Sequence, residues 1–257
     1  MSLFTMTKGT KRLLFAMLAV SVLYIGGMAL YYDYQNSAAD PRVASARIDM
    51  KNYQTNLSEK NWSGALDALD SAEAIYANVP AYQKSFERGV LENDKAAVYL
   101  LTMENHLLTM ETPELDDKGR WLLEQAEFHA QNAKKIYTKW LKNFGTVSGT
   151  TLRTDLEPYF TDNDFPNADA ERIRERRLQE LIDAQTETPR RLSVTLTNLG
   201  IIARYNGNGA QAASLYQEAL EYWPDNETAK ANLARLRGED HEGRSALEKL
   251  FPPKRLQ

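Results

Sequence analysis

Carboxylates between residues 145 and 170 are the side chains whose types and spacing could do chemistry. Two pairs lie close in sequence, Asp155 with Glu157 and Asp162 with Asp164. Such a pair can act as general acid and general base in a hydrolase or lyase if a cleft gives the two groups different environments. Nothing in the sequence indicates a cleft, so an envelope hydrolase that uses these residues is an alternative and not the expected function.

The segment from Asp162 to Asp169, DNDFPNAD, also places three carboxylates close together. Oxygen ligands of this kind bind hard cations such as Ca²⁺. The segment lacks the mid-loop glycine and the terminal glutamate of an EF-hand loop. We therefore expect a solvated acidic loop, and an ion site is the alternative.

Other catalytic groups are absent from the sequence or badly spaced. The three histidines, His106, His129 and His241, form no H-x-x-x-H or HExxH motif, and His129 is expected on a helix face. The GTVSG stretch at 145–149 lacks the serine position and the preceding strand of a nucleophile elbow. The chain has no cysteine, which excludes thiolate zinc sites, disulfides, cysteine nucleophiles and an acylated lipoprotein cysteine. We expect no catalytic site, cofactor, metal or small-molecule substrate.

Composition and charge favour a folded helical protein that does not bind nucleic acid. Of 257 residues, 43% are apolar and 26% charged, with helix formers dominant, so we expect an all-α fold. Residues 33–257 carry 31 − 3 = 28 bases against 35 acids, which is a poor balance for phosphate binding. The ERIRERR stretch at 171–177 alternates in charge and is interpreted as a solvated, salt-bridged face, with a docking patch for an acidic partner as the alternative.

The N-terminal segment has the length and composition of a membrane span. Residues 13–32 contain no charge, and a helix of that length covers about 30 Å. Basic residues precede the span and acidic residues follow it, so the positive-inside rule predicts a cytoplasmic 1–12, an uncleaved anchor at 13–32 and a linker at 33–40. A cleaved signal peptide is the alternative, but the apolar run is long for one. We expect a single-pass protein of a bacterial inner membrane with its bulk in the periplasm.

Hydrophobic periodicity divides the rest of the chain into helices. Helical hairpins are expected over 41–145, with helices at 41–57, 61–80, 82–91, 94–110 and 112–145. A long loop is expected over 146–168, followed by a helical region over 169–237 with interruptions near 188–189 and 206–209. Residues 238–257 form a polar tail.

The region 193–226 has the residue pattern of a two-helix repeat. With Ser193 as position 1 of a 34-residue unit, small residues fall where two helix backbones meet, larger ones fill the space between hairpins, and a proline ends the second helix. The chain here resembles the tetratricopeptide repeat (TPR) family. The matching residues are Leu196, Leu199, Gly200, Ala212, Tyr216, Ala219 and Pro224. One position departs from the pattern, because Ala203 stands where the family has a tyrosine.

The resemblance implies a degenerate helical-repeat domain in which residues 227–237 form a capping helix and 61–80 resembles the second helix of a weaker unit. Ligands of this family usually lie along the first helices. That face would here present Val194, Thr197, Asn198, Ile201, Arg204 and Tyr205. The family's version that grips a C-terminal carboxylate has Lys and Asn where this chain has Thr197 and Ile201, so we expect an extended peptide or a partner helix instead. The alternative is that these residues only pack on the preceding helix.

Together these features predict a non-enzymatic, membrane-anchored periplasmic scaffold. Its partner would be another envelope or inner-membrane protein, whose complex it helps to assemble, mature or stabilise. The layout is similar to that of two kinds of bacterial protein: periplasmic TPR accessories of the secretion channel, and accessory proteins encoded with enzyme-maturation systems. A structural subunit of a larger membrane machine is the alternative.

Overall fold

The computed structural model describes residues 38–110, 115–165 and 169–239. The predicted anchor at 13–32, most of the predicted linker and most of the tail lie outside the described residues. Within the described ranges the fold is all-α and contains no strand, as expected from the sequence. None of the helices in these ranges is long and apolar enough to cross a membrane.

Eight α-helices and three short 3₁₀ turns make up the described part of the chain. The α-helices are α2 (Ala44–Ser58), α3 (Trp62–Asn78), α4 (Phe86–Leu107), α5 (Asp117–Phe144), α6 (Gly149–Leu156), α7 (Ala170–Tyr205), α8 (Gly209–Tyr222) and α9 (Glu227–Arg237). The 3₁₀ turns are η2 (Pro41–Val43), η3 (Pro80–Tyr82) and η4 (Glu157–Tyr159). Most of the α-helices begin at an Asn, Asp or Ser whose side chain accepts a hydrogen bond from a backbone N–H of the first turn. These caps are Asn61, Asp116, Ser148, Asp169, Asn208 and Asn226.

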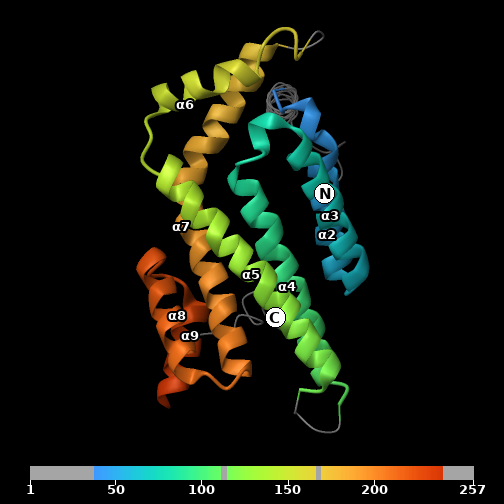
Figure 1. Ribbon diagram of the computed structural model, residues 1–257, viewed down its shortest axis with the longest axis vertical. Coiled ribbons are helices and arrows are strands. Elements are labelled where there is room, and N and C mark those ends of the chain that lie inside the picture. Colours follow the sequence, from blue (N-terminus) through green and yellow to red (C-terminus); the bar gives the residue numbers. More distant parts are fainter. Residues whose placement is uncertain (1–37, 111–114, 166–168, 240–257) are drawn as a thin grey trace, which may run out of the picture.

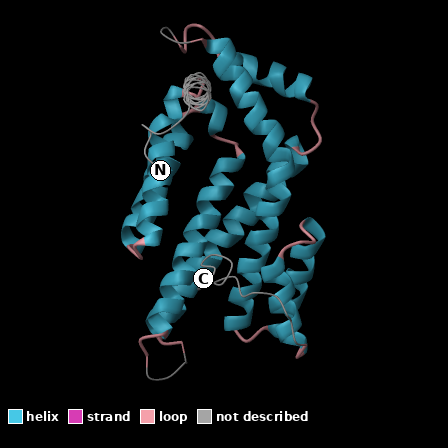
Figure 2. Ribbon diagram, turned by 180° about the vertical axis from the view of Figure 1, so that it is seen from behind, coloured by secondary structure: helices cyan, strands magenta, loops and turns pink. Residues whose placement is uncertain are grey.

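The helices form three hairpins that stack in chain order. The hairpins are α2–α3, α4–α5 and α7–α8; α3 also packs on α4, α5 on α7, and α9 covers the end of the third hairpin. In Figure 1, α2 and α3 lie on one side, α8 and α9 on the other, and α4, α5 and α7 lie between them. Figure 2 shows the same order from behind. This order, in which each helix packs mainly on its sequence neighbours, is compatible with a helical-repeat stack.

Close helix approach depends on two glycines. Gly200 of α7 lies under the ring of Tyr216 of α8, where a Cβ would overlap the ring. Gly89 of α4 lies in the same way under Tyr137 of α5. Both tyrosines are buried, so the ring of each fills the space between the two helices of its hairpin.

Three predicted breaks are wrong. Helix α4 is continuous through 92–93, because Glu92 and Lys95 are buried and paired to neighbouring helices. Helix α7 continues through Pro189, since packing of buried residues on both sides of the proline outweighs the lost backbone hydrogen bond. The predicted loop at 146–168 contains α6 and η4, and Leu152 and Leu156 anchor them to the core.

Two predicted boundaries also change. Of the predicted linker at 33–40, Ala38 and Asp40 are buried, so the folded domain has begun by residue 38. Helix α5 begins at Asp117 with Asp116 as its cap, and the start predicted at residues 112–113 lies outside the described residues.

Candidate functional site

One hollow of the described surface is a groove beside α6. Its larger part, of about 390 Å³, lies between residues 80–85, the end of α5, α6 and α7. A smaller hollow of about 170 Å³ shares the wall formed by 83–85, Trp140 and Phe144, so the two are continuous. We refer to both together as the α6 groove. Helix α6 and the end of α5 lie at one end of the molecule, beside the N-terminal half of α7 (Figure 1).

The floor of the α6 groove is apolar and firmly packed. It is formed by Trp140, Phe144, Leu152, Leu156 and Leu181. The Trp140 ring packs edge-on against Phe86, with the ring centroids 5.7 Å apart. Gln185 donates from Nε2 to the carbonyl oxygens of Phe144 (2.6 Å) and Val147 (2.8 Å), which holds the turn between α5 and α6. The groove is therefore bounded by side chains that tertiary packing holds in place.

The edge of the groove on the α5 side is basic. Lys84 and Lys139 line it, are exposed, and have no ion pair within the described ranges. Lys135 and Lys142 extend this edge, because residues four and three apart share one helix face. On the α6 side the single acidic group that lines the groove is Asp155. The arrangement is an apolar trough with an excess of positive charge along one side.

A buried ion-pair cluster lies behind the groove. Arg177 of α7 is 1% exposed, pairs with Glu87 of α4 and Glu180 (3.1 Å), and lies over the ring of Tyr82 at 4.0 Å. Burial by itself would raise the pKa of Glu87, but the Arg177 guanidinium outweighs burial and holds that pKa below its ordinary value. Glu180 also pairs with Arg47 of α2 at 3.2 Å. The cluster thus joins the first, second and third hairpins.

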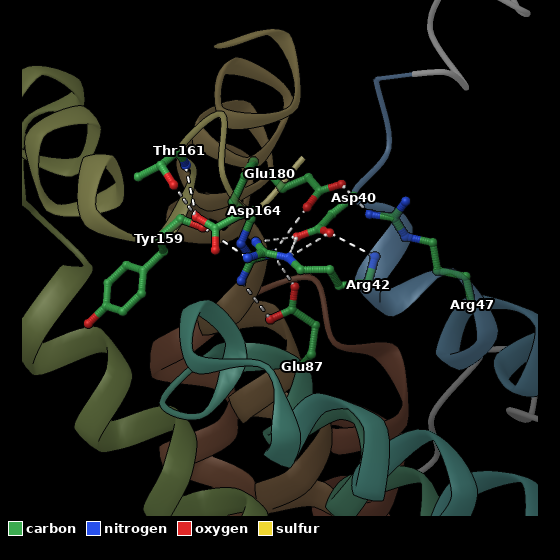
Figure 3. Close-up of polar contacts among 9 residues, drawn as sticks. Asp40, Arg42, Arg47, Glu87, Tyr159, Thr161, Asp164 and Glu180 are labelled. Carbon is green, nitrogen blue, oxygen red and sulfur yellow. Dashed lines mark hydrogen bonds and ion pairs between the residues drawn. The ribbon is translucent and has the colours of Figure 1, made fainter. Parts of the chain in front are cut away.

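The start of the described chain is held by a second set of polar contacts (Figure 3). Arg42 pairs with Asp40 at 2.8 Å and donates to the carbonyl oxygen of Tyr159 at 2.9 Å. Its guanidinium lies 4.8 Å from the ring centre of Phe160 and 4.5 Å from that of Phe165. These contacts attach the N-terminal end of the domain to η4, next to the α6 groove.

The predicted catalytic carboxylates are not brought together in a cleft. Asp155 lines the α6 groove, whereas Glu157 is an exposed residue of η4. Asp164 is exposed and accepts hydrogen bonds from the backbone N–H and the hydroxyl of Thr161, and these bonds lower its pKa. Asp169 accepts from the N–H of Arg172 as the cap of α7. No group of three or more His, Asp or Glu among the described residues is placed to hold a metal ion.

Two of the histidines make structural contacts. His106 of α4 bonds to Asp116, the cap of α5, at 2.9 Å. His129 of α5 bonds to Glu92 of α4 at 2.8 Å and stacks on Tyr99. His129 thus lies at the interface of the second hairpin, and His241 lies outside the described residues.

The ERIRERR stretch is salt-bridged, as expected, but it is only partly solvated. Arg174 pairs with Glu171 at 2.9 Å, and Arg153 of α6 pairs with Glu175 at 2.6 Å. The interpretation is wrong for Arg177, which is buried because α4 lies over this face of α7.

The predicted partner face of α7 is largely covered by other helices. Thr197 is 3% exposed, donates to the carbonyl oxygen of Ser193 at 2.8 Å and accepts from Asn226 at 3.0 Å. The prediction that Thr197 contacts a partner is therefore wrong, because the turn into α9 covers this residue. Asn198 donates to Asn93 of α4 at 3.2 Å. Val194 is the member of this set that is clearly exposed, at 38%.

The remaining members of the predicted face are half-buried. Ile201 and Tyr205 pack against the apolar cluster of α4 and α5. Arg204 lies 5.6 Å from the ring centre of Tyr205. Burial raises the pKa of the nearby Glu104, and the charge of Arg204 opposes this rise only in part. These contacts correspond to the alternative given above, in which this face packs on the preceding helices.

Sequence reasoning missed the α6 groove. One signal was available, because Ser148 can cap a helix that carries Leu152 and Leu156 on one face. A second was the row of lysines at 135, 139 and 142 on one face of a predicted helix. No local pattern indicates that these two segments meet around Trp140.

Comparison with known proteins adds no identification. No family model matches the chain, and neither the search of curated proteins nor the search of solved structures found a match.

Proposed function

We propose that this protein is a membrane-anchored, TPR-like scaffold that binds another envelope or inner-membrane protein through the α6 groove and helps its complex to assemble. The observation that carries this proposal is the groove itself, which joins an apolar floor to a basic edge. A groove with an apolar floor and charged side chains at its edge is suited to bind a segment of another protein.

The charged groups of the interior support a scaffold. Two buried cations are paired between helices: Lys95 of α4 with Asp70 (2.5 Å) and Glu73 (2.6 Å) of α3, and Arg177 with Glu87. Such pairs hold hairpins in register, and each is satisfied by a partner on another helix. These two buried cations thus have a structural task.

The helix stack is consistent with a repeat protein. The hairpin predicted from the repeat pattern has Gly200 against Tyr216 and buried small residues at Ala212 and Ala219. Repeat stacks offer extended surfaces for partner binding because each hairpin contacts only its neighbours.

A short segment between the predicted anchor and the domain would limit how far the α6 groove can lie from the membrane. Five residues, 33–37, separate the predicted span from the first buried residue, Ala38. Fully extended, they reach roughly 20 Å. Because Arg42 is bound to η4 beside the groove, an anchor at 13–32 would keep the α6 groove near the membrane surface.

Site-specific photo-crosslinking in intact cells tests the scaffold proposal. A photoreactive amino acid replaces Asn143, which lines the smaller hollow, and Asn52, which is exposed on α2, serves as the control. We expect a discrete crosslinked envelope protein from position 143 and not from position 52. Identical patterns at the two positions, or none from either, would contradict the proposal.

A reporter fusion tests the membrane topology separately. Alkaline phosphatase fused behind Gln257 is expected to be active, because the enzyme folds only after export. An inactive phosphatase together with a fluorescent cytoplasmic reporter at the same position would place the domain in the cytoplasm and remove the periplasmic part of the proposal.

A further inference from the structure

The two hollows of the α6 groove differ in chemistry. The larger one is floored by Leu152, Leu156 and Leu181 and borders on the exposed ring of Tyr159. Its volume of about 390 Å³ lies in the range of pockets that bind organic ligands. It is therefore large enough to accept one bulky apolar side chain together with some of its backbone.

The smaller hollow has a mainly apolar lining that is edged by three cationic side chains. Lys84, Arg88 and Lys139 line it, with Trp140 and Phe144 shared from the larger hollow. Arg88 is already paired with Glu73 at 3.4 Å, but the two lysines have no acidic partner in the part of the chain that the structure describes. An incoming carboxylate would meet these charges without having to break an ion pair.

The positive charge is concentrated beside the groove, whereas the domain as a whole is acidic. Residues 33–257 carry seven more acids than bases, yet α5 contains no acid after Glu127 and has four lysines after it. Among the residues that the structure describes, only Lys134 of these four has an ion pair, to Glu218 at 3.0 Å. A field of this kind attracts and orients an anionic partner while the rest of the surface repels it.

A peptide fits this site better than a bilayer surface. The apolar residues lie at the bottom of a recess, which a side chain can enter and a flat membrane surface cannot. The carboxylate of Asp155 lines the same recess and would repel the phosphates of anionic lipids. A peptide can instead place its apolar residue near Asp155 and its acids near the lysines.

We propose that the α6 groove binds an acidic segment of the partner protein, with one aromatic or leucine side chain in the larger hollow and carboxylates beside Lys84 and Lys139. This inference rests on the proposed scaffold function and specifies the chemistry of its partner. One buried apolar side chain would anchor the segment, and the charged side chains on either side of it would orient the segment. Other proteins that bind short peptide segments combine contacts in this way.

Selection from a random peptide library on the purified full-length protein provides the first test. Enriched peptides are expected to combine one Phe, Tyr, Trp or Leu with two or more acidic residues. Enrichment of basic or uncharged peptides, or no enrichment at all, would overturn the assignment.

A fluorescent reporter in the groove provides the second test. The chain has no cysteine, so Asn143→Cys can be labelled at a single site. Titration with a selected peptide is expected to give a saturable signal that weakens as salt is added. The variant Lys84→Glu/Lys139→Glu should bind roughly tenfold or more weakly. The matched control Lys51→Glu/Lys118→Glu, with the same change in net charge on exposed residues outside the groove, should bind normally.

The outcomes separate this inference from the proposed function. If peptides bind but both double variants behave like the parent protein, the groove is not the site, while the scaffold function stands if crosslinking from another position succeeds. If the label at position 143 is instead quenched by brominated anionic lipids and ignores the acidic peptides, the surface belongs to the bilayer and the inference is wrong.

Discussion

Tyr137 of α5 lies against Gly89 of α4 so closely that a Cβ at position 89 would be 2.5 Å from its ring. Tyr216 and Gly200 are related in the same way in the third hairpin. The two residues are 16 positions apart in the third hairpin, where both lie near the turn between α7 and α8. They are 48 positions apart in the second hairpin, because Gly89 lies near the start of α4 and Tyr137 near the end of α5. The same glycine–tyrosine contact thus occurs at two different sequence separations. This difference explains why residues 82–145 show no clean repeat pattern.

Alanine at either glycine tests this relationship. Gly89→Ala and Gly200→Ala should each lower the free energy of unfolding by about 1–3 kcal/mol, since a buried ring must move. Gly209→Ala is the matched control, because a Cβ there meets nothing within 4 Å, and it should be neutral or slightly stabilising. Urea unfolding followed by circular dichroism measures all three, and equal effects at the three glycines would contradict the contact.

The buried pair of Arg177 and Glu87 should matter more than any surface pair. Glu87→Gln leaves the Arg177 charge with Glu180 alone, and we expect a loss of about 2–4 kcal/mol. Replacing both residues with apolar ones, as in Arg177→Met/Glu87→Leu, should cost less than the sum of the single changes. Glu187→Gln, which breaks the exposed pair with Arg190, should cost under about 1 kcal/mol in the same chemical denaturation assay.

Asp94 should make the folded protein less stable as the pH rises. Burial raises its pKa from 3.8 to about 6, against weaker lowering by Asn93 and Arg191. The folded state therefore binds the proton more tightly than the unfolded state, so stability declines between pH 4 and pH 6 as Asp94 ionises. Asp94→Asn should remove this decline and stabilise the protein at pH 7, because an amide carries no charge to bury. The full pKa shift corresponds to about 3 kcal/mol, and we expect about 1–2 kcal/mol because Asp94 is partly exposed to water.

Unfolding of the parent and Asp94→Asn proteins at pH 4 and at pH 7 measures this effect. Asp67→Asn, an exposed position on α3, is the control and should leave the pH dependence unchanged. A parent protein whose stability relative to Asp94→Asn does not change with pH would show that Asp94 titrates normally.

Asn226 should hold α9 on the third hairpin. Its side chain accepts from the N–H of Ala229 (3.1 Å) and donates to the hydroxyls of Ser193 (2.9 Å) and Thr197 (3.0 Å), all buried. Asn226→Ala should cost about 2 kcal/mol and speed hydrogen exchange in 227–237. Asn208→Ala removes the exposed cap of α8 and should cost about 1 kcal/mol without this local effect. Unchanged exchange in α9 would mean that apolar packing alone holds the helix.

The sequence by itself determined the all-α class, most of the helices and the two helices of the hairpin at 193–226. Apolar periodicity and capping residues such as Asn61 and Asn208 act within one or two turns, so they can be recognised locally. The same locality limits the prediction, because a proline or a polar run looks like a break even where packing carries the helix through it, as at Pro189.

Tertiary structure alone decided which faces are covered and where the groove lies. Thr197 and Arg177 occupy positions that a helical wheel assigns to a partner or to solvent. Residues 29 and 90 positions away in the sequence nevertheless bury them, Asn226 and Glu87 respectively. The α6 groove likewise needs α5, α6 and α7 to meet around Trp140. Burial is a property of the assembled stack, and no short stretch of sequence contains the residues that provide it.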